Sequence, residues 1–455
     1  MKIVIAGAGE VGSHLAKMLS TEANDITVID ADQTRLDALK AYTDVITVTG
    51  NTASVDVLKK AEVDKADLFI AVNPSTSQNV NIVSSLLAKQ LGSKRVTARI
   101  NNEEYLSHEN NLMFKSLGID LMFYPEKIAA NEIADLLRRT ASTDALEFGR
   151  GKLQLSVFRI DEDSNLIDMK LIDFNREIAT EAALQFRVVA IARGSETIMP
   201  KSETRFKYGD MVFIMSKREG QATLMQYIVK KNIAIKNIMI LGGGPIAAMV
   251  ARKMSPQVNS IKIIEMKKER CIQLSESTPD NVLVVHADGR NTDRLLEENI
   301  KDYDAFVAVT GSSETNILAC VEAKKLGIER TIAEVENVEY IRLAEEMGVD
   351  AVINKKLITA GKIFKLTLSN KVRFIKHMSG TDAEIVEFIV AKGSKATKAP
   401  IKDLNFPHDA IIGGIIRKNE GIIAVGDTQI QEYDRVAVFA APSAVKEVDK
   451  FFKDY

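Results

Sequence analysis

The first thirty residues place three glycines between two short apolar segments. Ile3–Ala6 is an apolar run rich in β-branched residues, which is typical of a buried strand. Gly7, Gly9 and Gly12 follow in the G-x-G-x-x-G spacing, and apolar residues then recur at helical spacing from Val11 onward. A strand, a glycine turn and a helix in this order predict the first unit of a Rossmann-like sheet that binds a dinucleotide.

Each glycine of this turn has its own physical role. Gly7 allows the tight turn out of the strand, Gly9 lets a pyrophosphate approach the backbone, and Gly12 lets the helix pack close to the strand. The unpaired N–H groups at the start of the helix, together with its dipole, favour a phosphate at this point. The predicted pyrophosphate site, formed mainly by backbone, comprises Gly7, Ala8, Gly9, Glu10, Val11 and Gly12. The side chain of Glu10 is explained equally well as a carboxylate that the helix dipole stabilises.

A second strand, Ile26–Ile29, ends at Asp30, eighteen residues after Gly12. A carboxylate in this position accepts hydrogen bonds from the hydroxyls of an adenine ribose. It also repels a 2′-phosphate. The sequence therefore favours NAD(H) or a plain adenine nucleotide over NADP(H).

Strands and helices continue to alternate along the first half of the chain. Strands are expected at 44–49, 67–72, 95–100 and 120–123, and helices at 31–41, 55–61, 79–91 and from Pro125 to about Arg139. Alternation of this kind predicts a doubly wound parallel sheet of the α/β class.

The ends of the later strands supply further candidate site residues. Asn51 and Thr52 follow the third strand, where they would touch the adenine end of a nucleotide. The fourth strand ends beside the crevice in which such sheets bind ligands, and the fifth ends in a cation that could reach a phosphate. These two strands contribute Ala71, Val72, Asn73 and Arg99.

Residues 150–228 have a different pattern and predict a small α+β domain. Leu153, Leu155 and Val157 alternate along one expected strand, and two short apolar strands follow at 188–192 and 211–215. The helix from Pro125 carries an apolar stripe that is a candidate face for a dimer, with packing on its own domain as the alternative. The stripe consists of Ile128, Ile133, Leu136 and Leu137.

The whole pattern then repeats, shifted by about 235 residues. Gly242 and Gly244 align with Gly7 and Gly9, and Ala247 aligns with Gly12. Further along, the alignment places Asn316 over Asn79 and Tyr433 over Tyr208. The predicted second site comprises Gly242, Gly243, Gly244, Pro245, Ile246, Glu265 and Asp288.

The chain is therefore predicted to be a tandem duplication of a nucleotide domain and a small domain. The expected boundaries are 1–140, 141–229, 230–368 and 369–455. Arg99 corresponds to Glu334 in the second half, and a carboxylate would not attract a phosphate. Pro245 removes one N–H from the second loop, although it presets a helical φ. We expect the first site to bind more tightly.

Composition argues against several classes of function. The 455 residues carry a formal net charge of −2 with no block of like charge, which argues against a nucleic-acid or anionic-membrane partner. The two cysteines, Cys271 and Cys320, form neither a disulfide framework nor a zinc motif and suit a reducing cytoplasm. No apolar run approaches eighteen residues and a strand follows Met1 directly, so neither a membrane span nor a signal peptide is expected.

The motifs together resemble those of the TrkA family of regulatory subunits of the Trk potassium uptake system. The matching segments are GAGEVG at 7–12, VID at 28–30, GN at 50–51, AVN at 71–73, ARI at 98–100, PEKIAANEIADLLR from Pro125 and DALEFGRGKLQL from Asp144. The family often has Asp-Glu before the asparagine matched by Asn79, where this chain has Thr76-Ser77-Gln78. It also often has a glycine after Gly50-Asn51, where this chain has Thr52.

This resemblance implies a fold and a function. It implies two RCK (KTN) domains, each followed by an RCK_C subdomain. It implies a cytoplasmic protein, peripheral to the membrane, that binds NAD(H) or ATP/ADP. Such proteins assemble as rings, usually tetramers, on a TrkH-type potassium-translocating subunit, and ligand binding changes the ring and gates the pore.

Two other functions are alternatives to a regulatory sensor. An NAD-dependent oxidoreductase would need a proton donor near the cofactor, but none of the five histidines forms a recognisable dyad. His14, beside the glycine turn, is better explained by packing or solvation. Tyr227 and Lys231 match the Tyr-x-x-x-Lys spacing by chance, far in sequence from either glycine turn. A purely structural subunit with degenerate pockets is disfavoured by the intact segment from Gly7 to Asp30. The sequence thus predicts a non-enzymatic protein without a metal site.

Overall fold

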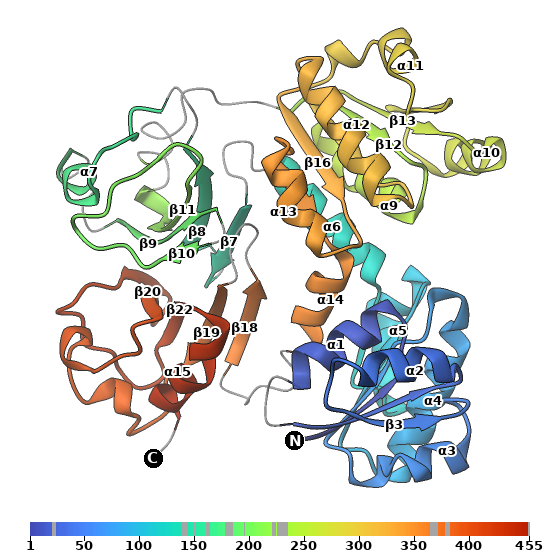
Figure 1. Ribbon diagram of the computed structural model, residues 1–455, viewed down its shortest axis with the longest axis horizontal. Coiled ribbons are helices and arrows are strands. Elements are labelled where there is room, and N and C mark those ends of the chain that lie inside the picture. Colours follow the sequence, from blue (N-terminus) through green and yellow to red (C-terminus); the bar gives the residue numbers. More distant parts are fainter. Residues whose placement is uncertain are drawn as a thin grey trace. The chain divides into compact units, whose positions relative to one another are not determined.

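The computed structural model of the chain shows two nucleotide-type domains and two small β domains (Figure 1). It describes residues 1–20, 24–138, 144–149, 151–160, 164–177, 185–194, 196–220, 224, 235–364, 372–377 and 383–453. By its internal contacts the chain divides into two compact units. The first unit is Met1–Asn131 with Asn354–Thr367, and the second is Glu132–Ile353 with Leu368–Tyr455.

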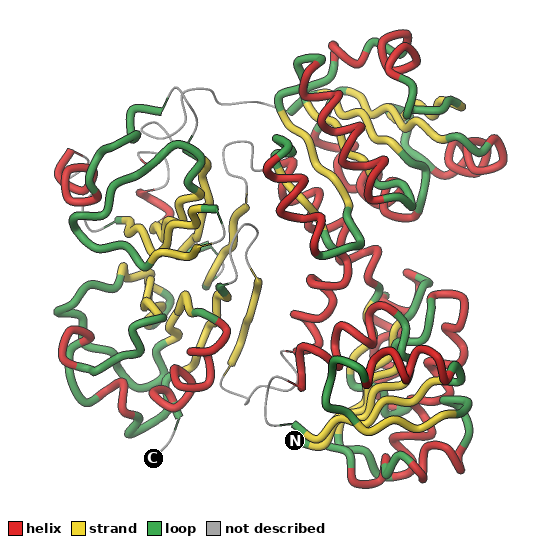
Figure 2. Tube along the Cα trace, in the orientation of Figure 1, coloured by secondary structure: helices red, strands yellow, loops and turns green. Residues whose placement is uncertain are grey.

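The first unit is built on a parallel sheet whose strand order, within the described residues, is β3-β2-β1-β4-β5-β6. Helices cover both faces, so the central strands are mostly apolar and largely buried, whereas the edge strand 46–49 is partly exposed (Figure 2). Strand order reverses between β1 and β4, which defines the switch point where doubly wound sheets bind ligands. The strands are β1 (Lys2–Ala6), β2 (Asp25–Asp30), β3 (Ile46–Thr49), β4 (Leu68–Ala71), β5 (Arg95–Arg99) and β6 (Leu121–Phe123). The helices are α1 (Glu10–Ser20), α2 (Gln33–Lys40), α3 (Val55–Lys60), α4 (Gln78–Leu91) and α5 (His108–Ser116).

The second nucleotide domain repeats this topology in the order β14-β13-β12-β15-β16-β17. A hydrogen bond repeats with it: Lys2 N donates to Asp67 Oδ2 at 2.9 Å, and Asn237 N donates to Asp304 Oδ2 at 2.8 Å. The strands are β12 (Asn237–Leu241), β13 (Ser260–Glu265), β14 (Val282–His286), β15 (Ala305–Ala308), β16 (Arg330–Glu334) and β17 (Ala351–Ile353). The helices are α9 (Pro245–Met254), α10 (Lys268–Ser277), α11 (Thr292–Glu297), α12 (Ser313–Lys325) and α13 (Glu339–Glu346).

The helix that follows each parallel sheet belongs, wholly or in part, to the compact unit that contains the other parallel sheet. Helix α14 (Lys355–Phe364) follows β17 but packs on α1 in the first unit. Helix α6 (Pro125–Arg138) follows β6, and its C-terminal half lies in the second unit, where Arg138 Nε donates to Gln257 Oε1 at 2.9 Å. The apolar stripe of α6 is buried within this one chain. The expectation that the stripe is a face for a second copy was therefore wrong.

The two small domains form antiparallel sheets in the orders β10-β9-β11-β8-β7 and β18-β19-β22-β20-β21. The first contains β7 (Asp144–Phe148), β8 (Leu153–Arg159), α7 (Leu171–Glu177), β9 (Phe186–Arg193), β10 (Glu196–Ile198) and β11 (Met211–Lys217). The second contains β18 (Val372–His377), β19 (Glu384–Ile389), β20 (Ala410–Arg417), β21 (Glu420–Ile423), β22 (Arg435–Ala440) and α15 (Val445–Phe452). The predicted tandem duplication of α/β and α+β domains is confirmed.

A single apolar core joins the two small domains. The rings of Phe213 and Phe439, one from each domain, lie 5.3 Å apart in this core. Arg187 of the first small domain also contacts the second: its Nη1 donates to the carbonyls of Ile412 and Ala424. A second core covers the other face of the first sheet, which explains why β8 is buried on both sides.

Each small domain also contains the same arginine–aspartate pair. Arg193 Nε donates to Asp210 Oδ1 at 2.8 Å, and Arg417 Nε donates to Asp434 Oδ1 at 3.0 Å. These pairs align Tyr433 with Gly209 instead of Tyr208, so the predicted alignment was one residue out. Gly209 has a φ of +81° and Tyr433 a φ of +67°. The tyrosine therefore occupies a left-handed position where the first domain has glycine.

Replacing Tyr433 by glycine is expected to raise the free energy of unfolding of the second small domain by about 1 kcal/mol. A left-handed conformation costs a residue with a Cβ about 1–2 kcal/mol, and the extra freedom of glycine in the unfolded chain offsets part of that gain. Denaturant unfolding would measure the change. Gly209→Ala is the matched reverse substitution and should destabilise; a stabilising Gly209→Ala would contradict the argument.

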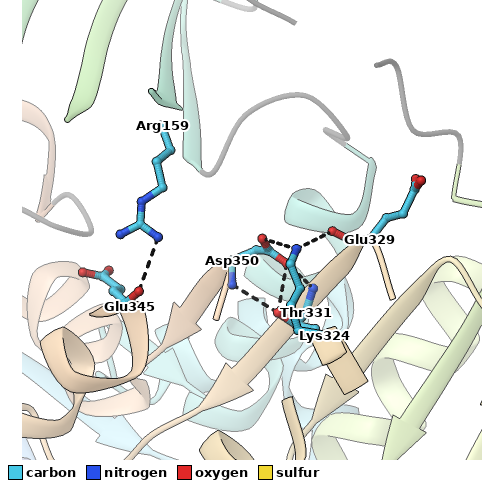
Figure 3. Close-up of polar contacts among 6 residues, drawn as sticks. All are labelled: Arg159, Lys324, Glu329, Thr331, Glu345 and Asp350. Atoms are coloured by element: carbon cyan, nitrogen blue, oxygen red, sulfur yellow. Dashed lines mark hydrogen bonds and ion pairs between the residues drawn. The ribbon is translucent and has the colours of Figure 1, made fainter. Parts of the chain in front are cut away.

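Polar contacts organise the end of the second parallel sheet (Figure 3). Asp350 accepts from Thr331 N at 2.8 Å and pairs with Lys324 Nζ at 2.7 Å. On α13, the backbone carbonyl of Glu345 accepts from Arg159 Nη1 at 3.3 Å, which links the first small domain to this helix. The carboxyl group of Glu345 does not make this bond. Its pKa is raised to about 7, mainly by burial; Arg159 opposes the rise and Glu346 adds to it.

Glu345→Gln is expected to stabilise the second unit above pH 7, by about 1–3 kcal/mol, and to change little near pH 4. The unfolded carboxyl titrates near 4.5, so the folded chain binds more protons between pH 4.5 and 7 and loses stability as the pH rises through that window. Glutamine cannot ionise and avoids this loss. Thermal unfolding at pH 4, 6 and 8 measures the effect, with Glu339→Gln, at an exposed position in the first turn of the same helix, as control. A pH-independent difference would contradict the raised pKa.

Candidate functional site

The predicted phosphate loop lies at the switch point of the first sheet. Gly7 has a φ of +115°, and a Cβ there would lie 2.9 Å from Asn73 N, so this glycine lets the β1 and β4 loops meet. A Cβ at Gly12 would collide with the carbonyl oxygen of Gly7. A Cβ at Gly9 would have no atom within 4 Å. The loop is thus tightly packed at its two ends and open at its middle, where a pyrophosphate is expected to approach.

Asp30 connects the end of β2 to this loop. Its Oδ2 accepts from Ala8 N at 2.6 Å and its Oδ1 accepts from Asp32 N at 2.8 Å. The residue is only 6% exposed, and both oxygens are held by backbone donors. Each carboxylate oxygen has two lone pairs, so both keep capacity for a hydroxyl donor such as a ribose. This geometry fits the ribose-binding role predicted for Asp30, which stays a prediction.

An asparagine that the sequence did not single out joins the loops after β4 and β5. The fully buried Asn81 accepts from Asn73 N at 2.9 Å and donates to the carbonyls of Asn73 and Arg99. Asn316 makes the same bonds in the second half, to Thr310 and Glu334. The counterpart of Asn316 is therefore Asn81, and the alignment with Asn79 was wrong.

The reason for this misalignment is a difference in loop length. Eight residues separate Asn73 from Asn81, and six separate Thr310 from Asn316. The shift that aligns Thr310 with Asn73 therefore cannot be carried through this loop. The overall shift of about 235 residues, which aligns Asn316 with Asn81, was the sequence signal that could have identified the residue.

The remaining predicted residues of the first site lie at the same edge of the sheet. Val72 is buried, and the buried Thr52 accepts from Asn73 Nδ2 at 3.0 Å. Asn51 is exposed and its Oδ1 accepts from Ala53 N. The structure brings together the ends of β1 to β4 as predicted, at Gly7, Ala8, Gly9, Glu10, Val11, Gly12, Asp30, Asn51, Thr52, Ala71, Val72 and Asn73.

Arg99 lies at the end of β5 but pairs with an acid of its own half. Its Nη2 is 3.3 Å from Glu126 Oε1 at the start of α6, and both side chains are largely buried. The Nε of Arg99 and the Oε2 of Glu126 are buried and make no hydrogen bond. A phosphate contact by Arg99 would therefore have to compete with Glu126, and this contact remains a prediction.

The second site repeats the first with a compensating pair of changes. Glu265 Oε2 accepts from Gly243 N at 2.7 Å and its Oε1 accepts from Lys267 N at 2.7 Å, so it replaces Asp30 in both bonds. A Cβ at Gly243 would lie 2.9 Å from the Glu265 side chain, whereas the first half has Ala8 there. Gly243 leaves room for the longer side chain of Glu265, so a buried carboxylate contacts this loop as well.

The other predicted residues of the second site are also at the sheet edge. Pro245 begins α9 directly after Gly244, and Ile246 is buried on that helix. Asp288 pairs with Arg290 at 2.7 Å, which lowers the pKa of Asp288. Unlike Asn51, the residue at the adenine end of this site therefore carries a charge that Arg290 neutralises.

The start of α1 makes one contact that the sequence did not predict. Glu10 Oε2 lies 3.0 Å from Nζ of Lys356, in the first turn of α14. The Glu10 side chain is 64% exposed and that of Lys356 is 16% exposed. The contact brings a residue of the second half of the sequence beside the first phosphate loop.

Residues weighed for redox catalysis are not gathered at this loop in the described part of the chain. His14 is on α1, whereas His286 lies on β14 with Nε2 3.1 Å from the carbonyl of Met266. Tyr227 and Lys231 lie outside the described residues. No group of three or more His, Cys, Asp or Glu side chains suited to a metal occurs among the described residues.

Two nucleotide-type domains, each followed by a small antiparallel domain, define a tandem nucleotide-binding architecture. Residues 3–125 and 238–355 match the TrkA-N domain family, and residues 155–229 and 385–453 match the TrkA-C domain family. The chain belongs to the TrkA family. The resemblance seen in the motifs is thus confirmed.

Relatives and solved structures agree with this assignment. The Trk system potassium uptake protein TrkA homolog 1 of Methanosarcina mazei is 33% identical over 464 residues, covering 100% of both chains. The GsuK channel bound to NAD has a TM-score of 0.60 at 16% identity, covering 99% of this chain and 78% of that chain. GsuK bound to ADP has a TM-score of 0.51 at 15% identity, covering 80% of this chain and 68% of that one. These structural matches show a shared fold.

Within the described ranges, no helix has both the length and the apolar character needed to cross a bilayer.

Proposed function

We propose that the chain is a nucleotide-binding regulatory subunit that gates a potassium-translocating membrane protein. The observation that carries this proposal is the buried Asp30 carboxylate bound to the phosphate loop at the switch point, in a chain of the TrkA family. The same arrangement occurs at Glu265, so each chain offers two sites. The proposed ligand is NAD(H), with ATP or ADP as the alternative in the same pocket.

The duplicated architecture suits regulation better than redox catalysis. A ligand shifts a gate only through different affinities for two conformations, and moving an equilibrium from 1:99 to 99:1 takes about 5.5 kcal/mol. Several nucleotide sites in one assembly could together supply this free energy. The exchange of α6 and α14 between the halves makes each unit depend on both halves of the chain. We therefore propose an allosteric subunit in preference to an oxidoreductase.

Membership of the TrkA family supports a proposal for the partner and the assembly. We propose a TrkH-type membrane subunit as partner, a homo-oligomeric ring of four chains as the assembly, and the cytoplasmic face of the membrane as the location. The domain boundaries proposed are 1–140, 141–229, 230–368 and 369–455. Their junctions fall at residues outside the described part of the chain.

Calorimetric titration with NADH, NAD⁺, ATP and ADP tests the binding step. Asp30→Ala is expected to weaken the tighter site about 10- to 100-fold, because it removes a charged acceptor from the ribose and from Ala8 N. Asp25→Ala, an exposed residue at the other end of β2, is the matched control and should bind normally. Steady NADH consumption with any carbonyl substrate would overturn the regulatory proposal, and equal binding by Asp30→Ala would overturn the site.

A further inference from the structure

A lysine from the second half of the sequence lies against the first phosphate loop. Nζ of Lys356 is 3.0 Å from the carboxylate of Glu10, and both residues belong to the first unit. Glu10 is the first residue of α1 and directly follows Gly9. The ammonium group therefore lies within the reach of one glutamate side chain from the first turn of α1, where the N–H groups are expected to receive the diphosphate of a nucleotide.

The position of this lysine is fixed by structure around it. Asn354, which is buried, accepts from Leu357 N at 3.0 Å and so sets the start of α14. Helix α14 packs along α1, which leaves the Lys356 side chain only 16% exposed. Ordering and partly desolvating a lysine is costly unless a negative group compensates it. The carboxylate of Glu10 is mostly exposed and compensates weakly, so a more strongly charged partner is favoured.

The duplication shows that this cation is a departure from the repeat. Lys355 and Pro125 both begin the helix after the last strand of their sheets, so Lys356 is the counterpart of Glu126. The strand beside that last strand ends in Glu334 in the second half (β16) and in Arg99 in the first (β5). Charge at both positions is reversed between the halves. As a result, α14, which packs on α1, carries a cation at the position where its counterpart α6 carries an anion.

We propose that Lys356 is a positioning residue of the first nucleotide site: on binding, its ammonium leaves Glu10 and holds the diphosphate of NAD(H) or of an adenine nucleotide. The inference deepens the proposed function and rests on it. It also assigns a mechanism of coupling, because the bound diphosphate would tie α14, which continues from the second half, to α1 of the first half.

Calorimetry with NADH and with ADP on the full chain tests this role. Lys356→Gln is expected to weaken nucleotide binding at the first site, which Asp30→Ala also weakens, by 10-fold or more. This is roughly the effect of removing one charge-assisted contact. Lys356→Arg should restore affinity to within about threefold, since it retains the charge. The matched control is Lys17→Gln, which removes the same charge from the exposed far end of α1 and should change affinity less than twofold.

A second variant decides the matter if Lys356→Gln does not fold. Glu10→Gln removes the carboxylate that competes for Lys356, so it should bind both nucleotides more tightly than the wild type. Binding by Glu10→Gln that is no tighter than the wild type, or binding by Lys356→Gln within twofold of the wild type, overturns the inference while leaving the proposed function intact. A wild-type chain that binds neither nucleotide overturns the proposed function itself.

Discussion

Replacing Gly9 by alanine is expected to weaken nucleotide binding about 100-fold while the free energy of unfolding changes by less than about 0.5 kcal/mol. A Cβ at this position meets no atom of the protein within 4 Å, so the folded chain tolerates it. The space that the methyl group would enter is the space through which a pyrophosphate must approach the backbone. Calorimetric titration gives the affinity, and thermal unfolding of the free chain gives the stability.

The second half provides the matched comparison for this experiment. Gly244 is the counterpart of Gly9, and a Cβ there also has no neighbour within 4 Å. Gly244→Ala should therefore leave the tighter, first site unchanged and affect only the second. Undiminished binding by Gly9→Ala would mean that the ligand does not use this loop.

Gly7→Ala is expected to act through stability, with a loss of about 3 kcal/mol in the first unit. The φ of +115° is strained for any residue with a Cβ, and the added carbon would lie 2.9 Å from Asn73 N and 3.0 Å from Val72 C. Both contacts are with backbone at the end of β4, so no side chain can rotate away. Nucleotide binding should be lost together with the fold of the loop.

The test is a denaturant titration of Gly7→Ala beside Gly9→Ala. The two substitutions add the same methyl group two residues apart, so composition and unfolded-state effects largely cancel between them. We expect the first to unfold at lower denaturant and the second at the wild-type midpoint. Equal midpoints would contradict the tight approach of the β1 and β4 loops.

Local patterns predicted the central part of the site. The glycine spacing, the flanking strands and the acid at Asp30 are all features of one short segment, and the structure places them together at the switch point. The exchange of Asp30 for Glu265 was also visible in the aligned halves. Its compensation by Gly243 was not, because only the folded loop shows that the longer acid lies over this glycine.

What the sequence could not predict depends on long-range geometry. Asn81 was missed because the first half has the longer loop, so the alignment of the strands before this loop cannot be carried past it. The stripe on α6 was interpreted as a dimer face, since periodicity shows that a face is apolar without showing what covers it. Lys356 reaches Glu10 only because α14 packs on the other half of the chain, and no local pattern contains that information.

The most direct test of the central claim is potassium flux through a TrkH-type partner reconstituted in vesicles with this chain. The account predicts that adding the nucleotide that binds most tightly in calorimetry changes the flux with the wild-type chain. It predicts no such change with Gly9→Ala at the same nucleotide concentration, because that variant folds but its first site, weakened about 100-fold, stays largely empty. A flux that nucleotide leaves unaltered, despite saturated binding to the wild-type chain, would contradict a gating role.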